Sequence, residues 1–421
     1  MTETRTTLSG LTKKVFGELV NTLPEFALGQ EAFPFKERAK IGKTYNELIV
    51  LRRPHGVTHQ YTSKQTAYTL NASRPMQTLE AEIDGAEIVM RDRVAYGMLA
   101  AALESGSRAY EGALPLVISE IQASHRFYLE LGIWYGNSPT GMGAIETVSG
   151  SGTTRTWTLS AEQWACGIWS QMEGAAIDVY DVTGATKRNS NAVVEVAGIN
   201  PDLRQVLVSG NATDLTAIVA TDFIVPVLAK GQQMTGLDAQ LLNTGTLFGI
   251  SAATYSTWKP NTYDCENTPL SLLTILAAMS KPVGRGLMAK QCKCFINEAV
   301  FTDLASDAAA LRTFTENQRT EVEQGTHSLK FNASNNNRVE LVSHPMIKQG
   351  DGFLVVPEHV TRGGESDITN GLPGKKGGDE FWFDLADAAG KEYREFSSQF
   401  VLHSKPSQAV KLYNIASRSD T

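Results

Sequence analysis

Cysteine is scarce in this 421-residue sequence: there are four, at irregular spacings, and they are Cys166, Cys265, Cys292 and Cys294. So few and so irregular a set excludes a disulfide framework. Cys292 and Cys294 lie in a run that alternates like a strand, Gln291 to Ile296, so both thiols are expected on the same face. No partner ligands stand nearby at a suitable spacing for a metal, and we expect buried, reduced thiols.

Long apolar runs are also missing. No stretch approaches the roughly 20 apolar residues that a membrane span requires. The first ten residues are polar and lack the apolar region of a secretory signal, so we expect a protein made and kept in a cytosol. Hydrophobic residues make up 42% and charged residues 20%, which is typical of a globular protein with a real core. The length suggests roughly two to four domains of about 100–200 residues each.

An excess of positive charge is missing as well. The net charge of −7 argues against a protein whose main task is to grip a nucleic-acid backbone. The first sixty residues nevertheless hold nine Lys/Arg against six Glu, or +3, so the remaining residues carry −10. This basic stretch either faces a polyanionic partner or is an ordinary fluctuation in composition.

Motifs of catalysis and cofactor binding are absent from the sequence. There is no phosphate-binding loop, nucleophile elbow, zinc-metalloprotease helix or dinucleotide fingerprint. His55 and His59 could share a face, but two ligands do not make a metal site. His344 and His359 are interpreted as turn residues. We therefore assign no catalytic, cofactor-binding or metal-binding residue, while an enzyme whose site is assembled from distant positions stays open as an alternative.

A long β-hairpin is predicted at Ile41–Leu70. Its strands are placed at Asn46–Leu51 and Val57–Leu70, with a turn at Arg53–Gly56. The second strand has few apolar residues, so little of it can be buried in its own domain. Because a long hairpin without its own core is marginal in water, we expect it to become ordered by lying on another subunit.

Helical periodicity is strongest at Asp92–Tyr135. Pro115 falls inside this pattern, so we expect two helical pieces that form one long rod. Further helices are predicted at Pro269–Ser280 and Glu298–Thr313. A shorter stripe precedes Pro24 in a polar N-terminal arm and consists of Leu11, Val15, Phe16 and Leu19.

Short β-rich pieces between Ala144 and Val227, divided by Gly, Asn and Asp turns, suit a small barrel or sandwich, which we interpret as an inserted domain. The segment Thr361–Gly378 holds six glycines in eighteen residues and is predicted to be a flexible loop. The predicted strands are Thr154–Leu159, Ala175–Tyr180, Ala192–Ile199, Gln205–Ser209 and Phe223–Val227, then Cys292–Ile296, Val339–Val342, Phe353–Val356, Glu380–Leu385, Phe396–His403 and Ala409–Ile415.

Five segments carry a family resemblance, in the order in which that family uses them. They are LGIWYGN at Leu131–Asn137, MTGLD at Met234–Asp238 with NTGTLFGI at Asn243–Ile250, ATYSTWK at Ala253–Lys259, CFINEAVF at Cys294–Phe301 and VELVSHPMIKQG at Val339–Gly350. Each is a packing or turn pattern. Together they resemble the major capsid proteins of tailed bacteriophages, those with the Hong Kong 97-type fold. The first 130 residues match this family by architecture only, as arm, extended loop and spine helix.

The resemblance implies an α+β phage major capsid fold. Its parts are an N-terminal arm (1–40), an extended β-hairpin loop (41–80), a peripheral domain with a long spine helix (81–143), an inserted small β-rich domain (144–228), a return to the peripheral domain (229–270), an axial domain (271–400) and a C-terminal return strand (401–421). The Lys187–Ser190 turn resembles that of relatives which carry the inserted domain. The Thr361–Gly378 loop would lie near the capsomer axis.

The resemblance also implies function and partners. The chain would be a structural subunit, not an enzyme, that self-assembles as pentamers and hexamers of an icosahedral head around double-stranded DNA, which it contacts non-specifically. Scaffold, portal and decoration proteins would be further partners, with no membrane. The location would be the virion, after assembly in the host bacterial cytoplasm. An encapsulin-like nanocompartment shell and a tail or baseplate component are alternatives.

Two sets of residues are expected to make these contacts. The basic arm would face packaged DNA or an acidic scaffold. Some relatives weld subunits through a Lys–Asn isopeptide bond, but a solvated lysine explains Lys64 and we predict no crosslink. The intersubunit set is Arg52, Arg53, His55, His59, Tyr61 and Lys64, and the interior arm set is Lys13, Lys14, Lys36 and Arg38.

Overall fold

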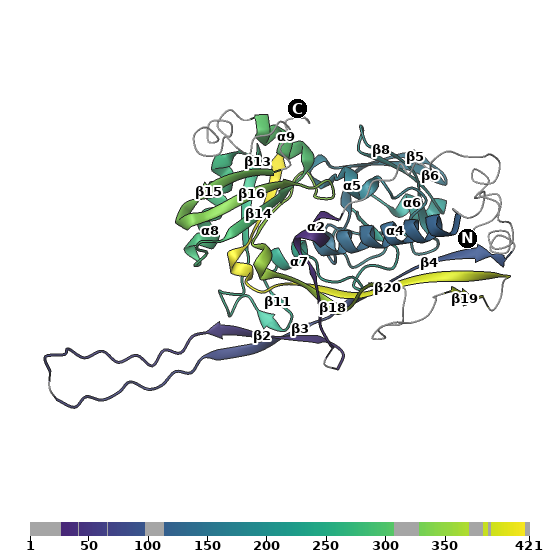
Figure 1. Cartoon of the computed structure of the whole chain (residues 1–421). Coiled ribbons are helices and arrows are strands. Elements are labelled where there is room, and N and C mark those ends of the chain that lie inside the picture. Colours follow the sequence, from purple (N-terminus) through teal and green to yellow (C-terminus); the bar gives the residue numbers. More distant parts are fainter. Residues whose placement is uncertain are drawn as a thin grey trace.

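The computed structural model describes residues 27–40, 42–64, 66–96, 113–306, 328–369, 382–385 and 389–416. Figure 1 shows a body that contains a five-stranded sheet, a six-stranded sheet and a closed barrel. A long hairpin projects from this body. Helices and strands are mixed along the chain, which confirms the predicted α+β class. Two predicted features, the helical stripe before Pro24 and the basic residues Lys13 and Lys14, lie outside the described residues.

A five-stranded sheet joins parts of the chain that are distant in sequence. β20 (Gly390–His403) pairs antiparallel with β4 (Ala86–Ala95) along one edge, and with β18 (Val360–Thr369) and β19 (Trp382–Asp384) along the other. β1 (Phe35–Glu37) extends the sheet in parallel beside β18. α4 (Ala113–Tyr135) lies along this sheet (Figure 1). We call this layer the arm sheet.

The helix predicted from Asp92 is wrong at its start. Asp92 to Ala95 lie in β4, where Asp92 is opposite Tyr393 of β20. Residues 97–112 of the predicted rod lie outside the described residues, and α4 covers its second piece. A short run of apolar residues fits both periods, and here the pairing with β20 decides in favour of the strand.

The flexible loop predicted at Thr361–Gly378 is also wrong where the structure describes it. Thr361 to Thr369 form most of β18, between β1 and β20. A Cβ on Gly364 would stand 2.0 Å from the Ser398 carbonyl oxygen, so this glycine permits close strand packing. The rest of the segment, from residue 370, lies outside the described part of the chain.

A second sheet of six strands forms the other half of the body. Two helices accompany it, α8 (Leu272–Gly284) and α9 (Glu298–Ser306). Its strands, in spatial order, are β13 (Asn261–Pro269), β21 (Val410–Ala416), β17 (Gly352–Val355), β14 (Gln291–Ile296), β16 (Asn337–Ser343) and β15 (Ser328–Ala333). Residues 360–369, 382–384 and 390–400, which the sequence groups with 271–356, pair in the arm sheet instead. The domain limits themselves stay a prediction.

The thiols on β14 behave as the alternating pattern predicts. Cys292 and Cys294 are both buried in one apolar cluster with Cys265. Burial raises the pKa of Cys292 to about 12, and it raises that of Cys265 to about 11, with the Asp264 charge adding to the effect. The expectation of burial is wrong for Cys166, which is exposed at the start of the four-residue helix α5 (Cys166–Trp169).

Residues 143–226 contain six strands that form a closed barrel. Trp157, Val179, Val196 and Val208 are fully buried, as expected for alternate residues of strands around a filled barrel. The small barrel or sandwich predicted here is therefore a barrel, although its status as an insertion stays a prediction. The strands are β5 (Gly143–Ser151), β6 (Thr154–Leu159), β7 (Ala176–Tyr180), β8 (Val194–Asn200), β9 (Gln205–Ser209) and β10 (Phe223–Pro226), with α6 (Ala212–Ala217) after β9.

The hairpin differs from its prediction in register and length. β2 (Tyr45–Arg52) is close to the predicted first strand, but its partner β3 is Gln77–Ile83 rather than Val57–Leu70. No turn occurs at Arg53–Gly56; the chain runs on, and His55 N–H donates to the Arg74 carbonyl at 3.0 Å. Polar residues without a core do not sustain strand pairing, so the two halves run as an open ribbon (Figure 1). Near its base lie the short strands β11 (Thr246–Leu247) and β12 (Ile250–Ser251). α7 (Leu237–Leu241) contacts α4, β20 and β21, and α2 (Leu28–Ala32) lies on α4.

Candidate functional site

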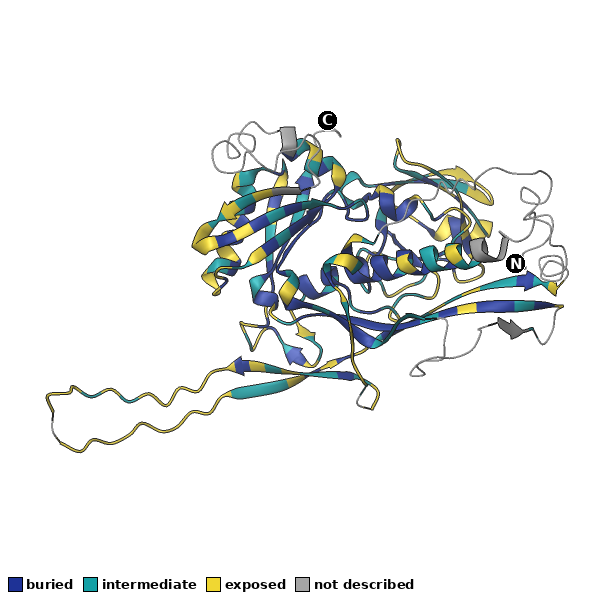
Figure 2. Ribbon diagram, in the orientation of Figure 1, coloured by how far each residue is buried: buried dark blue, intermediate teal, exposed yellow. Residues whose placement is uncertain are grey.

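The hairpin extension, residues 53–76, is the most exposed part of the described chain. None of its described residues is buried, and Figure 2 shows it in yellow, with little teal, well away from the body. Its exposed apolar side chains include Tyr61 and Leu70, which are 79% and 73% exposed. Isolated apolar residues on a surface are common, but an unsupported ribbon that carries several of them is a typical interaction surface.

The base of the hairpin, in contrast, is fixed to the body. Tyr45 and Ile83 are buried in a cluster with Trp258 and Phe400. The Tyr45 hydroxyl is 3.1 Å from Ser398 Oγ in β20 and accepts the Glu365 N–H. A rigid base therefore carries an extension that has no core of its own.

All predicted intersubunit residues lie on or beside the extension. Arg52 stacks over the Tyr255 ring, with 5.3 Å between the guanidinium carbon and the ring centroid. The other five, Arg53, His55, His59, Tyr61 and Lys64, are exposed. His55 and His59 do not flank a turn, because the chain reverses near Lys64, whose N–H donates to the Tyr61 carbonyl.

The predicted interior arm residues are only partly visible. Lys36 is exposed on β1, and Arg38 is 3.5 Å from Glu47 of β2. Nothing in the described residues brings Lys36 and Arg38 together with a second basic cluster of the arm. Their interior role stays a prediction.

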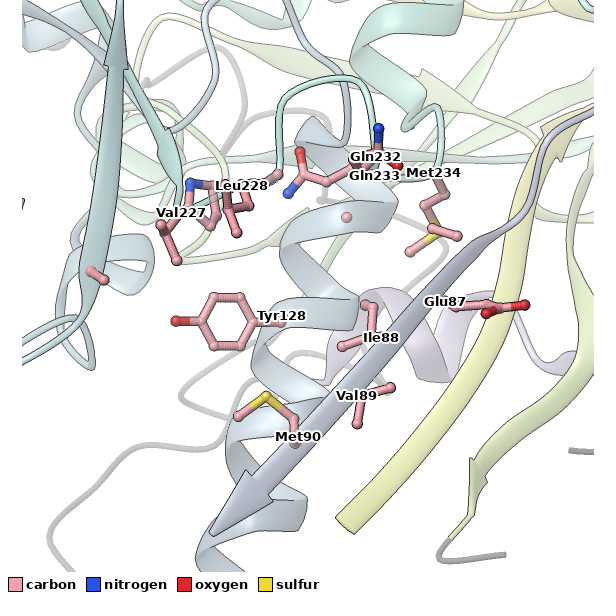
Figure 3. A pocket seen from close by; sticks show the side chains of 15 residues that line it. Glu87, Ile88, Val89, Met90, Tyr128, Val227, Leu228, Gln232, Gln233 and Met234 are labelled. Carbon is pink, nitrogen blue, oxygen red and sulfur yellow. The ribbon is translucent and has the colours of Figure 1, made fainter. Parts of the chain in front are cut away.

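Open cavities on the body include one near α4 and one at the base of the hairpin. The larger, about 400 Å³, lies between β4, α4 and the segment after β10. Figure 3 shows Val89, Tyr128, Leu228 and Met234 around it, with Glu87 at one edge. The Glu87 carboxylate is bound by Lys40 at 3.0 Å, so the groove offers few free polar groups to orient a substrate. The second cavity lies at the base of the hairpin.

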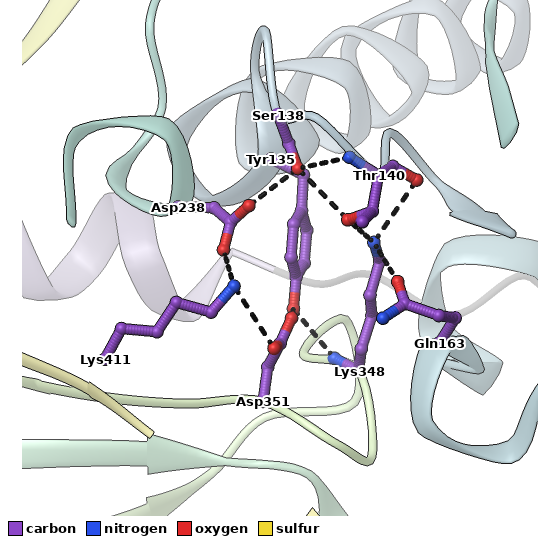
Figure 4. Close-up of polar contacts among 8 residues, drawn as sticks. All are labelled: Tyr135, Ser138, Thr140, Gln163, Asp238, Lys348, Asp351 and Lys411. Atoms are coloured by element: carbon purple, nitrogen blue, oxygen red, sulfur yellow. Dashed lines mark hydrogen bonds and ion pairs between the residues drawn. The ribbon is translucent and has the colours of Figure 1, made fainter. Parts of the chain in front are cut away.

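A buried polar network joins the barrel, α4, α7 and the six-stranded sheet (Figure 4). Lys348 Nζ donates to Thr140 Oγ1 at 2.8 Å and to Gln163 Oε1 at 2.9 Å. Burial lowers the pKa of Lys348 to about 8, although Asp351 and Asp238 oppose the shift. The network therefore holds these parts in one arrangement through groups that are costly to leave unpaired.

The second half of this network centres on Lys411 of β21. Its ammonium group pairs with Asp238 of α7 and, at 3.2 Å, with Asp351. Burial alone would lower the pKa of Lys411, but the two carboxylates raise it, so this lysine stays charged. Burial raises the pKa of Tyr135, whose hydroxyl donates to Asp351 (Figure 4).

Glu130 of α4 is a second buried charge. It accepts hydrogen bonds from the Gly29 N–H at 2.7 Å and from Trp134 Nε1 at 2.8 Å, and it is 2.8 Å from His344 Nε2. Burial would raise its pKa, yet His344 and the other donors lower it overall. His344 was interpreted as a turn residue, and that is incomplete: its backbone turns after β16 while its ring is fully buried.

One cluster resembles a catalytic triad in composition. His125 Nε2 is 2.7 Å from Ser397 Oγ, and His125 Nδ1 is 3.5 Å from Glu395 Oε2. The second distance is not a hydrogen bond, and all three side chains are at most 1% exposed. None of the three lines either cavity. Because no substrate can reach the Ser397 hydroxyl, we interpret the cluster as a packing contact between α4 and β20 and not as a catalytic site.

His359 was also interpreted as a turn residue, and its ring is buried as well. It lies 6.2 Å from the ring of His403. Sequence reasoning missed this pair and the charged networks. The one available signal was a charged residue within an apolar run, such as Glu130 in YLELGIWY and Lys348 in PMIKQ.

Within the described ranges, no three His, Cys, Asp or Glu side chains are grouped so that they could hold a metal ion. Among the helices that the structure describes, none is both long and apolar enough to cross a membrane.

Comparisons with known proteins identify the fold. No family model and no curated protein matches the chain. Among solved structures, a chain of the capsid asymmetric unit of cyanophage A-1(L) aligns over 96% of both chains, at 11% identity and a TM-score of 0.54. Chains from the capsid of cyanophage P-SCSP1u (10% identity, 96% of this chain and 94% of that one, TM-score 0.48) and from Mycobacterium phage Bobi (11%, 97% and 98%, 0.44) also align. The chain has a phage capsid fold, as the resemblance predicted.

Proposed function

We propose that this chain is the major capsid protein of a tailed bacteriophage, a structural subunit that self-assembles into an icosahedral head around double-stranded DNA. The observation that carries the proposal is the hairpin extension: a ribbon with exposed apolar side chains on a rigid base. A free monomer gains nothing from such a ribbon, whereas a subunit that spreads modest contacts over several neighbours gains stability by multivalency.

Arg52, Arg53, His55, His59, Tyr61 and Lys64 contact neighbouring subunits in pentamers and hexamers. The arm with Lys13, Lys14, Lys36 and Arg38 faces the interior. Scaffold, portal and decoration proteins join the shell, which assembles in the host cytoplasm and remains in the virion. The barrel is an insertion into the surrounding fold.

Replacement of residues 53–76 by Asn-Gly tests the proposal. This two-residue turn suits a β-hairpin, and it leaves Tyr45, Leu51 and Ile83 in their buried cluster. The variant should be soluble, with a melting temperature within about 3 °C of the parent, since the extension buries almost nothing. Electron microscopy and light scattering should find shells or rings for the parent and only small species for the variant.

A milder variant removes two apolar side chains from the extension. Tyr61→Ser/Leu70→Ser should reduce assembly, whereas the matched control Val182→Ser/Val193→Ser should not, although these barrel valines are also exposed, by 67% and 52%. Normal shells from the shortened variant would refute the assignment of the hairpin. A parent that stays monomeric even with its scaffold supplied would refute the capsid function and favour the enzyme alternative.

An encapsulin-like nanocompartment would also be a closed shell, but it would enclose cargo proteins instead of DNA. Shells purified from the native source should contain double-stranded DNA under the phage proposal. Shells filled with a protein cargo, and free of DNA, would favour the nanocompartment.

A further inference from the structure

A cleft of about 360 Å³ opens at the base of the hairpin, between the end of β2 and three segments of the body. Four of its lining residues are cationic: Arg52 and Arg53 of the hairpin, Arg285 after α8, and Lys405 after β20. No carboxylate is among the lining residues. The cleft therefore gathers positive charge from three separate parts of the chain.

No ion pair within the described residues neutralises these four cations. Arg285 Nη1 donates to the Lys259 carbonyl at 2.6 Å, and Arg52 stacks on Tyr255. The charge of Lys405 acts on Glu358, but that carboxylate is already bound by Lys290. Like charges around one concave site repel one another, and an anion that enters the cleft relieves the repulsion.

The same hairpin base carries an acidic ridge on its other strand. Glu80 and Glu82 of β3 are exposed and alternate with the buried Ala81 and Ile83, so both carboxylates point to one face. The exposed Asp84 follows directly. No ion pair joins these three carboxylates to any described cation. They are spaced at roughly 6.5–7 Å along the strand, which suits a cleft with several cations.

We propose that the cationic cleft of one copy binds the Glu80–Asp84 ridge of a second copy, an inference that rests on the proposed function. Each chain then carries both halves of the contact on different surfaces. Such a heterologous contact repeats from subunit to subunit and closes into a ring when the rotation allows. The match of charges also fixes the order of neighbours, because ridge against ridge or cleft against cleft would be repulsive.

The ridge is a better occupant than a nucleic-acid backbone. Between Leu48 and Leu79 the hairpin contains no acidic residue, and the next carboxylate after Glu47 is Glu80 of the ridge. The chain as a whole is acidic, at −7, which disfavours a phosphate backbone along an open surface. A short acidic strand edge fits a bounded cleft, whereas a duplex requires an extended basic strip.

Charge reversal tests the contact. The cleft variant is Arg285→Glu/Lys405→Glu, the ridge variant is Glu80→Lys/Glu82→Lys, and a third variant combines all four changes. Lys43→Glu/Arg338→Glu is the matched control, because both residues are exposed and have no ion pair among the described residues. Melting temperatures first establish that each variant folds.

Light scattering and electron microscopy then measure the yield of rings or shells. Each two-residue charge variant should lower the yield at least about tenfold, because the contact becomes like-charged. The combined variant should recover at least about half of the parental yield, and the control should match the parent. Parental yield from either charge variant, or no recovery in a folded combined variant, would overturn the proposal. Normal shells that lose only their DNA in the cleft variant would identify a phosphate ligand and would also overturn it.

A crosslink separates this contact from the proposed function. In a Cys166→Ser background, purified Lys405→Cys and Glu82→Cys chains are mixed under mild oxidation. A disulfide-linked heterodimer in excess over either homodimer supports the contact even where no shell forms. A heterodimer no more abundant than in a Lys405→Cys and Thr183→Cys mixture would refute the contact while leaving the capsid function intact.

Discussion

Glu130 of α4 and His344, which follows β16, meet at 2.8 Å in a fully buried contact between the helix and the six-stranded sheet. The Met346 N–H donates to His344 Nδ1, which places the imidazole proton on Nε2 and lets it donate to Glu130. The two ring nitrogens thus each contact one neighbour. The contact joins two residues that are 214 positions apart in the sequence.

Replacement of Glu130 by glutamine should destabilise the subunit. The amide has the same shape but presents two N–H donors to a site made of donors, from Gly29, Gln30, Trp134 and His344. We expect a loss of about 2–4 kcal/mol in the free energy of unfolding. Urea denaturation of the unassembled subunit measures it. The exposed Glu146→Gln serves as a control, and an equal effect of both changes would contradict a special role for the buried contact.

Acid should weaken the subunit through the His359/His403 pair. Burial lowers the pKa of His359 to about 4 and that of His403 to about 3, from about 6.5 when unfolded. The unfolded chain therefore binds more protons below pH 6.5, and stability falls as the pH drops from 6.5 toward 4.

The melting temperature of the unassembled subunit, measured every half unit from pH 7.5 to 4, follows this loss. Glu130 acts in the same direction at lower pH, because its lowered pKa gives stability that is lost as pH falls through the folded value. His403→Asn keeps an acceptor for the Lys405 N–H and should flatten the slope between pH 6.5 and 5. An unchanged slope in this variant would show that the pair does not titrate as described.

A methyl group at Gly364 should be poorly tolerated. Its Cβ would stand 2.0 Å from the Ser398 carbonyl oxygen, so β18 and β20 would have to move apart. Gly364→Ala should lower the unfolding free energy by about 2–4 kcal/mol. Gly284→Ala is the control, because nothing lies within 4 Å of a Cβ there. Both variants are compared by thermal and urea denaturation, and equal stabilities would contradict the close packing.

One of the four cysteines should react readily with a thiol reagent, and the other three should be protected. Cys166 is exposed, whereas Cys265, Cys292 and Cys294 are buried and burial raises their pKa values. A chromogenic disulfide reagent at neutral pH should label one thiol per native chain and four in denaturant. Cys166→Ser should abolish the reaction of the native chain. Fast labelling that persists in this variant would show that the cluster around Cys265, Cys292 and Cys294 opens to solvent.

The sequence alone predicted the bounds of individual strands better than it predicted which strands pair with one another. Thr154–Leu159 and Gln205–Ser209 agree with β6 and β9 residue by residue, because their alternation reports burial on one face. β5 was missed, since only Gly143 and Ile145 of its nine residues are buried and its pattern is weak. The glycines of β18 suggested a loop because a glycine that permits close packing and one that permits flexibility look the same in a sequence.

The exposed hairpin was predicted from the sequence, but its geometry was not. The hairpin was expected to be unsupported, and that holds, yet its turn was placed too early because Arg53-Pro54-His55-Gly56 has turn composition. No local signal reveals that His55 faces Arg74. The cationic cleft was not foreseen either, since Arg53, Arg285 and Lys405 meet only through the tertiary fold.

The pairing of Ala86 with Gln399 in the arm sheet also has a consequence for synthesis. β4 leaves the ribosome long before β20 exists, so the sheet beneath α4 cannot close until residues 390–403 have been translated. Contacts so distant in sequence form slowly, because a long loop must close first. A nascent chain therefore has no finished docking surface for a neighbour, and translation itself delays oligomerisation until each chain has folded.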